Sequence, residues 1–111
     1  MSIKNTKPRT DIEFSALPGD DTLMGLSEFF KSFSDLTRMK LMLVLCQKEA
    51  CVGELSEILN ATASAVSHQL KILRQLKLVK CRREGKNMYY SLDDLHVQQI
   101  IKLGLTHINE K

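Results

Sequence analysis

The spacing of the apolar residues changes once along the chain, and this change limits the fold more than any other feature of the sequence. Up to Leu76 the apolar residues recur three and four positions apart, which is typical of helices that bury one face. Beyond it, residues 78–82 and 88–92 have the pattern of two short strands, and Gly85 in the turn 84–87 accepts a positive φ. The sequence therefore predicts a group of helices followed by a β-hairpin.

Four helices are predicted before the hairpin, starting near Asp20, and one after it, reaching to about Asn109. The third spans Val52 to Leu59, and Asn60 after it tolerates the left-handed conformation of a helix C-terminus. Side chains able to cap a helix precede three of them: Ser34 or Asp35, Thr62, and Asp93 or Asp94. The apolar faces expected on the five helices are, in order, Leu23, Leu26, Phe30 and Phe33; Leu36, Met39, Leu43 and Cys46; Val52, Leu55 and Leu59; Val66, Leu70 and Leu73; and Val97, Ile100, Ile101, Gly104, Leu105 and Ile108.

The chain is long enough for one domain with one modest core. Residues 1–20 hold both prolines and little apolar periodicity, so we expect a flexible tail before a domain at residues 21–111. We find no secretory signal, and the longest apolar stretch, residues 41–46, is too short to cross a membrane. We therefore expect a cytoplasmic protein without a membrane partner. Its three cysteines, Cys46, Cys51 and Cys81, are expected to be free thiols.

Basic residues concentrate in one segment of the chain. Between Thr62 and Tyr90 there are seven lysines and arginines and one acidic residue, which gives this segment a net charge of +6 in a chain of net charge +3. A basic segment in an otherwise slightly acidic chain favours a localised phosphate-binding surface. Charge alone leaves a solvated helix face open as the alternative.

The two helices on either side of Asn60 form a predicted helix-turn-helix, whose recognition helix runs from Thr62 to about Lys77. Small polar side chains at its start suit the major groove, because short donors and acceptors reach base edges without steric conflict. Basic side chains near the hairpin tip suit the phosphate backbone. The predicted DNA-binding residues are Thr62, Ser64, Ser67, His68, Gln69, Lys71, Arg82, Arg83 and Lys86. Two alternatives remain, in which these side chains only face solvent or the domain binds protein.

Several short stretches form a specific combination of motifs: CVGEL at 51–55, SAVSHQLKIL at 64–73, LV at 78–79, REGK at 83–86 and YYSL at 89–92. Together they resemble the ArsR/SmtB metal-sensing transcriptional repressors, over nearly all of the chain from about residue 23. The resemblance implies a mainly helical winged helix-turn-helix fold in the order α-α-α-α-β-β-α. It also implies a homodimer that represses transcription from double-stranded operator DNA and leaves it when an effector binds, with Ser64, Ser67 and His68 facing the groove.

The predicted last helix carries two histidines that cannot hold one metal ion within a single chain. His96 and His107 are eleven residues apart, so they lie on nearly the same face but roughly 16 Å apart along the axis. Two such helices packed antiparallel about a two-fold axis would bring the start of one beside the end of the other. Asp94 and Glu110 would complete each of the two equivalent sites with two nitrogen and two oxygen ligands. This set favours zinc, with cobalt as a possible substitute.

All four positions match the inter-subunit zinc site of the zinc-sensing members of this family. By the same resemblance, a hydrogen bond from His107 to the backbone carbonyl of Lys77 passes the signal to the recognition helix. The alternative interpretation makes Asp94 only an N-cap and the two histidines surface residues.

Cys51 and Glu54 match part of a second, cysteine-containing metal site of some relatives. Residues 1–20 contain neither Cys nor His, so we expect no functional thiolate-rich site. A rival hypothesis is a thiol-based sensor of oxidants, persulfides or soft metals that uses Cys46, Cys51 and Cys81. An enzyme has little support, because the sequence has no glycine-rich phosphate loop and we find no catalytic constellation.

Overall fold

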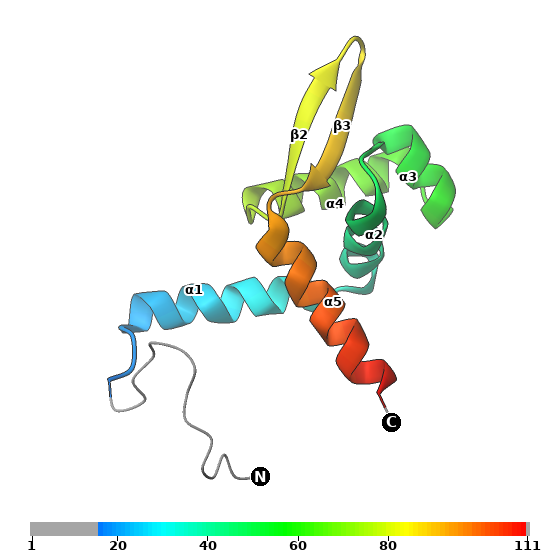
Figure 1. The fold of residues 1–111 in the computed structure, drawn as a ribbon. Helices are drawn as coiled ribbons and strands as arrows, with labels where there is room; N and C mark the ends of the chain where they lie inside the picture. Colours follow the sequence, from blue (N-terminus) through cyan, green and yellow to red (C-terminus); the bar gives the residue numbers. More distant parts are fainter. Residues whose placement is uncertain (1–15, 111) are drawn as a thin grey trace.

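The computed structural model describes residues 16–110. The elements are α1 (Asp20–Lys31), the short 3₁₀ helix η1 (Ser32–Ser34), α2 (Leu36–Gln47), β1 (Ala50–Cys51), α3 (Val52–Leu59), α4 (Ala63–Gln75), β2 (Val79–Glu84), β3 (Asn87–Leu92) and α5 (Leu95–Asn109). Figure 1 shows the β2–β3 hairpin, which we call the wing, projecting from the helices, while α1 and α5 extend away from it. The predicted order of helices and hairpin strands is confirmed, and most of the predicted tail lies outside the described residues.

The wing belongs to a small antiparallel sheet of order β1-β3-β2. Within the hairpin, Val79 pairs with Leu92 at the base and Glu84 pairs with Asn87 at the tip, where Gly85 has a φ of 65°. β1 was not predicted, since two residues are too few to show an alternating pattern. Its pairing with β3 joins the base of the wing to the segment between α2 and α3.

Capping side chains fix where three helices begin. The carboxylate of Asp35 accepts a hydrogen bond from the backbone N–H of Arg38 at 2.9 Å at the start of α2. Thr62 accepts in the same way at the start of α4, as does Asp94 at the start of α5, each at 3.1 Å. Each predicted helix start is thus confirmed at one of its candidate caps.

Residues with positive φ end two helices. Asn60 follows α3 with a φ of 55°, as its residue type predicts. Lys77 follows α4 with a φ of 62°, and the next N–H, that of Leu78, donates to the carbonyl of Leu73 at 2.9 Å. This closing turn ends α4 at Gln75, slightly before the predicted end.

The core lies where α2, α3 and α4 meet the base of the wing. Its largest fully buried side chains are Leu41, Met42, Leu55, Val66, Leu70, Leu73, Leu78 and Val79. The buried face predicted for α2 is wrong, because Leu41, Met42 and Leu45 face the core whereas Leu36 is 69% exposed. Apolar residues occur on every side of this helix, so their spacing does not single out the buried face.

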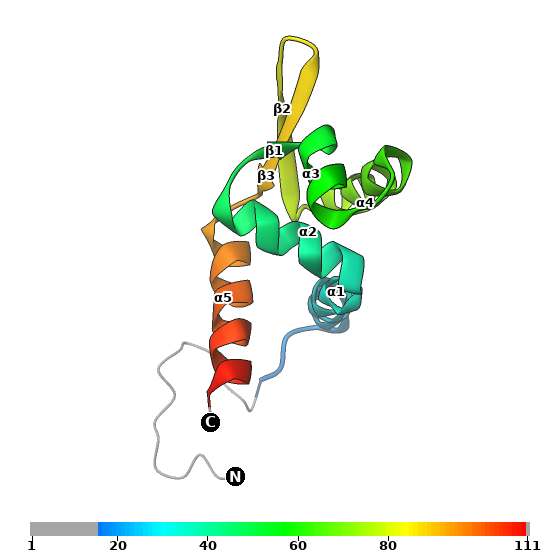
Figure 2. The same ribbon diagram turned by 90° about the vertical axis from the view of Figure 1, so that its right-hand side faces the viewer.

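Two helices keep apolar side chains exposed in the single chain. α1 buries none of its residues, and Phe30 is 53% exposed. α5 packs on the core through Val97 and Ile101, but Ile108 near its end is 74% exposed. Between α5 and the start of α2 lies an apolar groove of about 290 Å³. Figure 2 shows the two helices diverging from the point where α2 ends and α5 begins. The groove is lined by Phe33, Met39, Leu43, Ile100, Ile101, Gly104, Leu105 and Ile108. Patches of this kind mark interaction sites.

Candidate DNA-binding surface and metal site

α4 presents small polar side chains on the side opposite its buried stripe. Ser64, Ser67, His68 and Lys71 are all exposed. Thr62 is exposed too, but its hydroxyl oxygen already accepts the capping hydrogen bond. The structure thus brings together on one helix face the polar residues that the sequence predicted for the major groove.

Gln69, another predicted DNA-binding residue, is held by a neighbouring helix. Its side-chain carbonyl accepts a hydrogen bond from Arg38 Nε at 3.1 Å, and both side chains are partly buried. Arg38 itself lies on α2, one turn after the cap residue Asp35. The Gln69 amide therefore keeps its N–H groups available, while its oxygen is already occupied.

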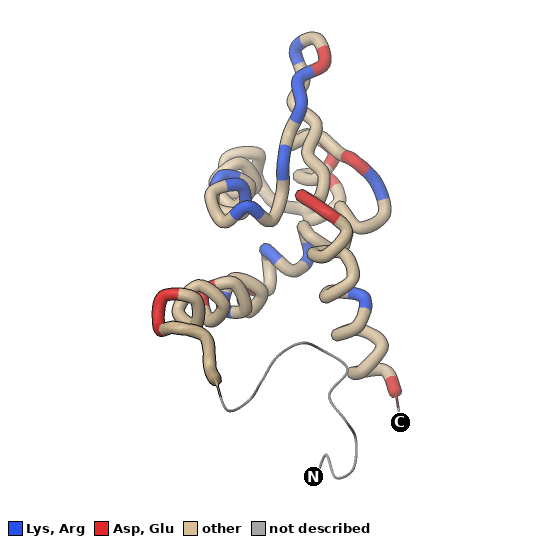
Figure 3. The backbone as a smooth tube through the Cα atoms, turned by 60° about the vertical axis from the view of Figure 1, so that its left-hand side comes forward, with Lys and Arg blue, Asp and Glu red and all other residues tan. Residues whose placement is uncertain are grey.

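Basic residues line one side of the wing and of α4, as Figure 3 shows. Arg83 and Lys86 lie near the wing tip, are exposed, and form no ion pair within residues 16–110. Side chains of this kind at the tip of a projecting hairpin can reach the phosphate backbone beside the groove.

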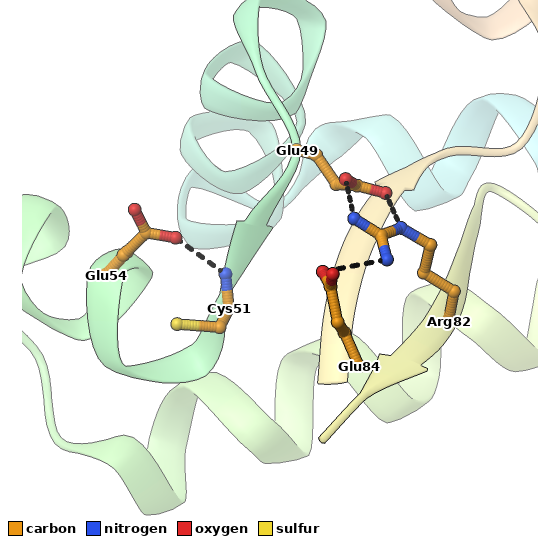
Figure 4. A network of polar contacts seen from close by, with 5 residues as sticks. All are labelled: Glu49, Cys51, Glu54, Arg82 and Glu84. Carbon is orange, nitrogen blue, oxygen red and sulfur yellow. Dashed lines mark hydrogen bonds and ion pairs between the residues drawn. The ribbon is translucent and has the colours of Figure 1, made fainter. Parts of the chain in front are cut away.

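Arg82 differs from the other basic residues of the wing because two carboxylates already hold it (Figure 4). Its Nε and one terminal nitrogen donate to the two oxygens of Glu49 at 2.9 and 2.8 Å, and its other terminal nitrogen donates to Glu84 at 3.1 Å. The guanidinium also lies 5.2 Å from the centre of the Tyr89 ring. These bonds raise the pKa of Arg82 and hold the pKa of Glu49 below its ordinary value.

Glu49 was not predicted as part of this surface. It lies just before β1 and is separated from Arg82 by 33 residues, so no local spacing reveals the pair. Because α2 leads into this segment, the pair joins the wing to the helical body.

Cys51 and Glu54 form a reciprocal cap at the start of α3, also drawn in Figure 4. The backbone N–H of Cys51 donates to Glu54 at 3.0 Å, and the Cys51 sulfur accepts from the Glu54 backbone. The hydrogen bond from Cys51 lowers the pKa of Glu54, and Lys48 adds an ion pair at 3.2 Å. Cys51 and Glu54 thus have a structural role at the start of α3.

The candidate metal ligands lie at the two ends of α5. Asp94 caps the helix, and its second oxygen lies 3.5 Å from Nδ1 of His96, whose side chain is 84% exposed. The capping hydrogen bond, with a smaller contribution from His96, lowers the pKa of Asp94 and keeps this carboxylate ionised. His107 lies in the last turn, and Glu110 follows as the C-cap residue.

One chain brings Asp94 and His96 together but does not bring His107 and Glu110 to them. Eleven residues of helix separate the two histidines by about 16 Å. Within residues 16–110, no three His, Cys, Asp or Glu side chains are grouped closely enough to hold a metal ion. The donor types fit zinc. Because one chain brings only Asp94 and His96 together, the four residues can form a complete site only with a second copy of α5.

The predicted coupling contact between His107 and Lys77 does not occur within one chain. Lys77 lies in the turn after α4, and no hydrogen bond joins these two residues in the described part of the structure.

The chain is similar in sequence to bacterial transcriptional regulators. Residues 35–80 match a family model described as "Bacterial regulatory protein, arsR family". The chain is 43% identical over 90 residues to the "Transcriptional repressor SmtB homolog" of Synechocystis sp., which covers 81% of this chain and 68% of that protein. It is 40% identical over 88 residues to the "Cadmium resistance transcriptional regulatory protein CadC homolog" of Staphylococcus aureus, covering 78% and 73%.

Among solved structures, the chain resembles a homodimeric winged helix-turn-helix DNA-binding domain from Mycobacterium bovis, described as a possible ArsR-family transcriptional regulator. The TM-score is 0.77 and the identity is 23%, over 86% of this chain and 91% of that one. At this identity the similarity shows a shared fold. No helix within residues 16–110 has the length and apolar character needed to span a membrane.

Proposed function

The chain belongs to the ArsR family of bacterial regulatory proteins, and from this premise we propose that it is a dimeric repressor which zinc releases from operator DNA. Its role is transcriptional regulation rather than catalysis, as it is for the relatives named above. We propose that such a regulator works in the cytoplasm, where operator DNA is accessible.

The metal part of the proposal rests on the positions of the four candidate ligands, two at each end of α5. Asp94 and His96 lie at its start, and His107 and Glu110 lie at its end. Two copies of α5 packed antiparallel about a two-fold axis would complete two equivalent sites. The exposed apolar side chains along α5 support this packing, because they give the second copy a surface to cover.

The dimer itself is supported by apolar surface that one chain leaves exposed. This surface comprises Met24, Leu26 and Phe30 on α1, and Leu103, Leu105 and Ile108 on α5. The Mycobacterium bovis domain of the same fold is a homodimer. We infer that α1 and α5 together form the dimer interface of this chain, with the two recognition helices on the opposite side.

Zinc fits the candidate ligands better than the soft metals do. Two imidazole nitrogens and two carboxylate oxygens suit zinc, with cobalt as a substitute, whereas cadmium prefers thiolates. One relative is named for cadmium resistance, so similarity to relatives does not identify the metal. The choice of zinc therefore rests on the ligand types in this chain. None of the four candidate ligands on α5 is a thiolate.

On DNA, each subunit would place α4 in a major groove of a roughly palindromic operator. Ser64, Ser67 and His68 would face the base edges, with Thr62, Gln69 and Lys71 close to them on the same helix. Arg83 and Lys86 would contact phosphates from the wing. We assign Arg82 to the support of the wing, because Glu49 and Glu84 already occupy its guanidinium.

Release would follow from a change in the angle between the two subunits. Asp94 and His96 of one subunit, with His107 and Glu110 of the other, would hold the metal and so favour one dimer geometry, whereas operator DNA would favour another. His107 would orient its ring through a hydrogen bond to the Lys77 carbonyl, which couples the ligand to the end of α4. A coupling of a few kcal/mol would suffice, since each 1.4 kcal/mol changes the operator affinity tenfold.

The test is operator binding measured by fluorescence anisotropy with and without zinc, for the wild-type protein and for His96→Ala and His107→Ala. We expect zinc to release the wild-type protein, and each variant to stay bound at the same zinc concentration. Lys102→Gln, an exposed change on α5 away from the face that carries His96 and His107, is the control and should respond to zinc like the wild type. If both histidine variants release DNA at the wild-type zinc concentration, the site is misassigned.

The thiol-sensor hypothesis makes the opposite prediction in the same assay. Alkylation of all three cysteines should leave zinc-driven release intact if the metal binds on α5. Loss of release after alkylation, with the histidine variants unaffected, would move the sensing site to the thiols.

A further inference from the structure

Each end of α2 is joined by one side-chain hydrogen bond to a helix with a functional role. At its C-terminal end the bond comes from α5, which carries the candidate metal ligands. Near its N-terminal end the bond goes to α4, the recognition helix. Figure 2 shows α2 running between these two helices. Gln98 is not one of the candidate metal ligands, and Arg38 is not one of the residues proposed to contact DNA.

Gln98 makes the bond at the C-terminal end of α2. Its side-chain amide donates to the backbone carbonyl of Cys46 at 3.0 Å, and both residues are partly buried. Cys46 lies in the last turn of α2, where helix carbonyls have no partner within the helix. Gln98 therefore satisfies a carbonyl that would otherwise lack a protein partner, which gives the contact a fixed geometry.

This bond is the specific link between α5 and the body of the domain. Within residues 16–110, it is the one side-chain hydrogen bond that joins α5 to another helix. α5 also packs on the core through Val97 and Ile101, and apolar packing of this kind is not directional. Gln98 also lies one helical turn after Asp94, so the link is close to one half of the ligand set.

Arg38 makes the bond at the other end. Its Nε donates to the side-chain oxygen of Gln69 at 3.1 Å, while its own backbone N–H is held by the cap residue Asp35. Gln69 directly follows His68, which faces outward for DNA. Arg38 and Cys46 are eight residues apart on α2, so the two bonds lie about 12 Å apart along the helix.

We propose that α2 is a strut that relays the position of α5 to the recognition helix, with Gln98 and Arg38 as its two positioning residues. A change in the direction of α5 moves the C-terminal end of α2 through Gln98. A helix with a fully buried face transmits this movement along its length rather than absorbing it. Arg38 then displaces Gln69 and the side chains beside it. The metal-dependent part of this inference rests on the proposed function.

The first arm of the test uses metal-free protein and does not depend on zinc. Gln98→Met removes the donor and keeps the size of the side chain, and Gln99→Met is its control on the exposed side of α5. Arg38→Met is compared with Lys40→Met, which removes the same charge from the same helix. We expect each link variant to weaken operator binding about three- to tenfold relative to its control, the range of one ordinary hydrogen bond. Equal affinities within both pairs would overturn the strut.

The second arm measures the ratio of operator dissociation constants with and without zinc. In the strut account this ratio falls about three- to tenfold in Gln98→Met and in Arg38→Met, while zinc affinity in a chelator competition stays near the wild-type value without DNA. An unchanged ratio in both link variants, beside a zinc-responsive wild type, would contradict the relay. A wild-type protein that ignores zinc would refute the proposed metal response, and the first arm would still decide whether the strut exists.

The double variant Gln98→Met/Arg38→Met separates one relay from two independent contacts. Two links in series predict that the second substitution changes the zinc ratio little once the first is present. If the two factors multiply, the bonds act separately and the strut account is wrong. Far-UV circular dichroism and sizing of every variant identify any loss of folding or of the dimer.

Discussion

Arg82 and Arg83 are neighbours on the wing, yet the structure predicts that they contribute differently to DNA binding. All three nitrogens of the Arg82 guanidinium donate to Glu49 or Glu84, whereas Arg83 forms no ion pair within the described residues. Arg82 would have to leave two carboxylates to reach a phosphate. We therefore expect Arg83 to release counterions on binding and Arg82 to release none.

The size of the difference follows from counterion release. Each phosphate contact contributes a slope of about −0.9 to a plot of log K against log salt concentration. In a homodimer the loss doubles, because both wings lose the contact. Arg83→Gln should therefore reduce the slope by about 1.8, which is roughly twelvefold in affinity between 50 and 200 mM salt. The paired change Arg82→Gln/Glu49→Gln keeps the net charge and should leave the slope at the wild-type value.

Glu49→Gln alone should change the salt dependence of operator binding in the direction opposite to Arg83→Gln. It frees part of the Arg82 guanidinium, so operator binding at low salt should become tighter and the slope steeper. Glu28→Gln on α1 removes the same charge without freeing an arginine, and serves as the control. The assay is operator anisotropy over a salt series in metal-free buffer. A slope for the Arg82/Glu49 pair that falls as far as that of Arg83→Gln would refute the reasoning.

Three further predictions concern single residues or pairs. Asp94→Asn keeps a good N-cap, so the thermal midpoint should hold while zinc affinity falls in a chelator competition; unchanged zinc affinity would leave Asp94 as a cap alone. Leu70→Ala should cost about 2–5 kcal/mol in urea unfolding at fixed protein concentration because Leu70 is fully buried, whereas the exposed Leu36→Ala should cost far less unless the dimer covers it. Arg82 lowers the pKa of Glu49, so the stability from this pair is present above the ordinary carboxyl value of about 4 and is lost as pH falls through the lower folded value. The urea midpoints of wild type and Glu49→Gln should accordingly differ at pH 6 and converge in strong acid, and a constant difference would contradict the pair's role.

Local signals in the sequence predicted much of the fold, because caps and turns depend on residues close in the chain. Thr62 and Asp94 cap helices, Asn60 ends one in the left-handed conformation, and Gly85 turns the wing. Each of these roles needs only a short side chain or a missing one at a fixed offset.

The features that the sequence did not reveal depend on contacts between distant segments. β1 is too short for a periodic signal, and it forms because β3 lies beside it. The sequence does not indicate which face of α2 is buried, because Leu36 and Leu41 are equally apolar. Tertiary packing buries Leu41 and leaves Leu36 exposed. The sequence predicted Arg82 as a DNA-binding residue, because no local pattern shows that the fold pairs its guanidinium with Glu49.

The candidate metal site was predicted from the sequence only as two halves. The residue types and the spacing on α5 indicate that one chain cannot complete the site, and the site itself stays a prediction. The completed site depends on how a second copy of α5 packs against the first. Neither the residue spacing nor a single chain provides that packing.

The most direct test of this account is zinc binding by a mixture of two inactive variants, His96→Ala and His107→Ala. Each homodimer lacks one histidine in both sites. A mixed dimer, however, has one site without either histidine and one site with both, because each site takes its halves from different subunits. After equal amounts are mixed and allowed to exchange subunits, the account predicts tight zinc binding at about a quarter of the wild-type stoichiometry. No recovery of tight binding in subunit-exchanged dimers would contradict a site shared between subunits.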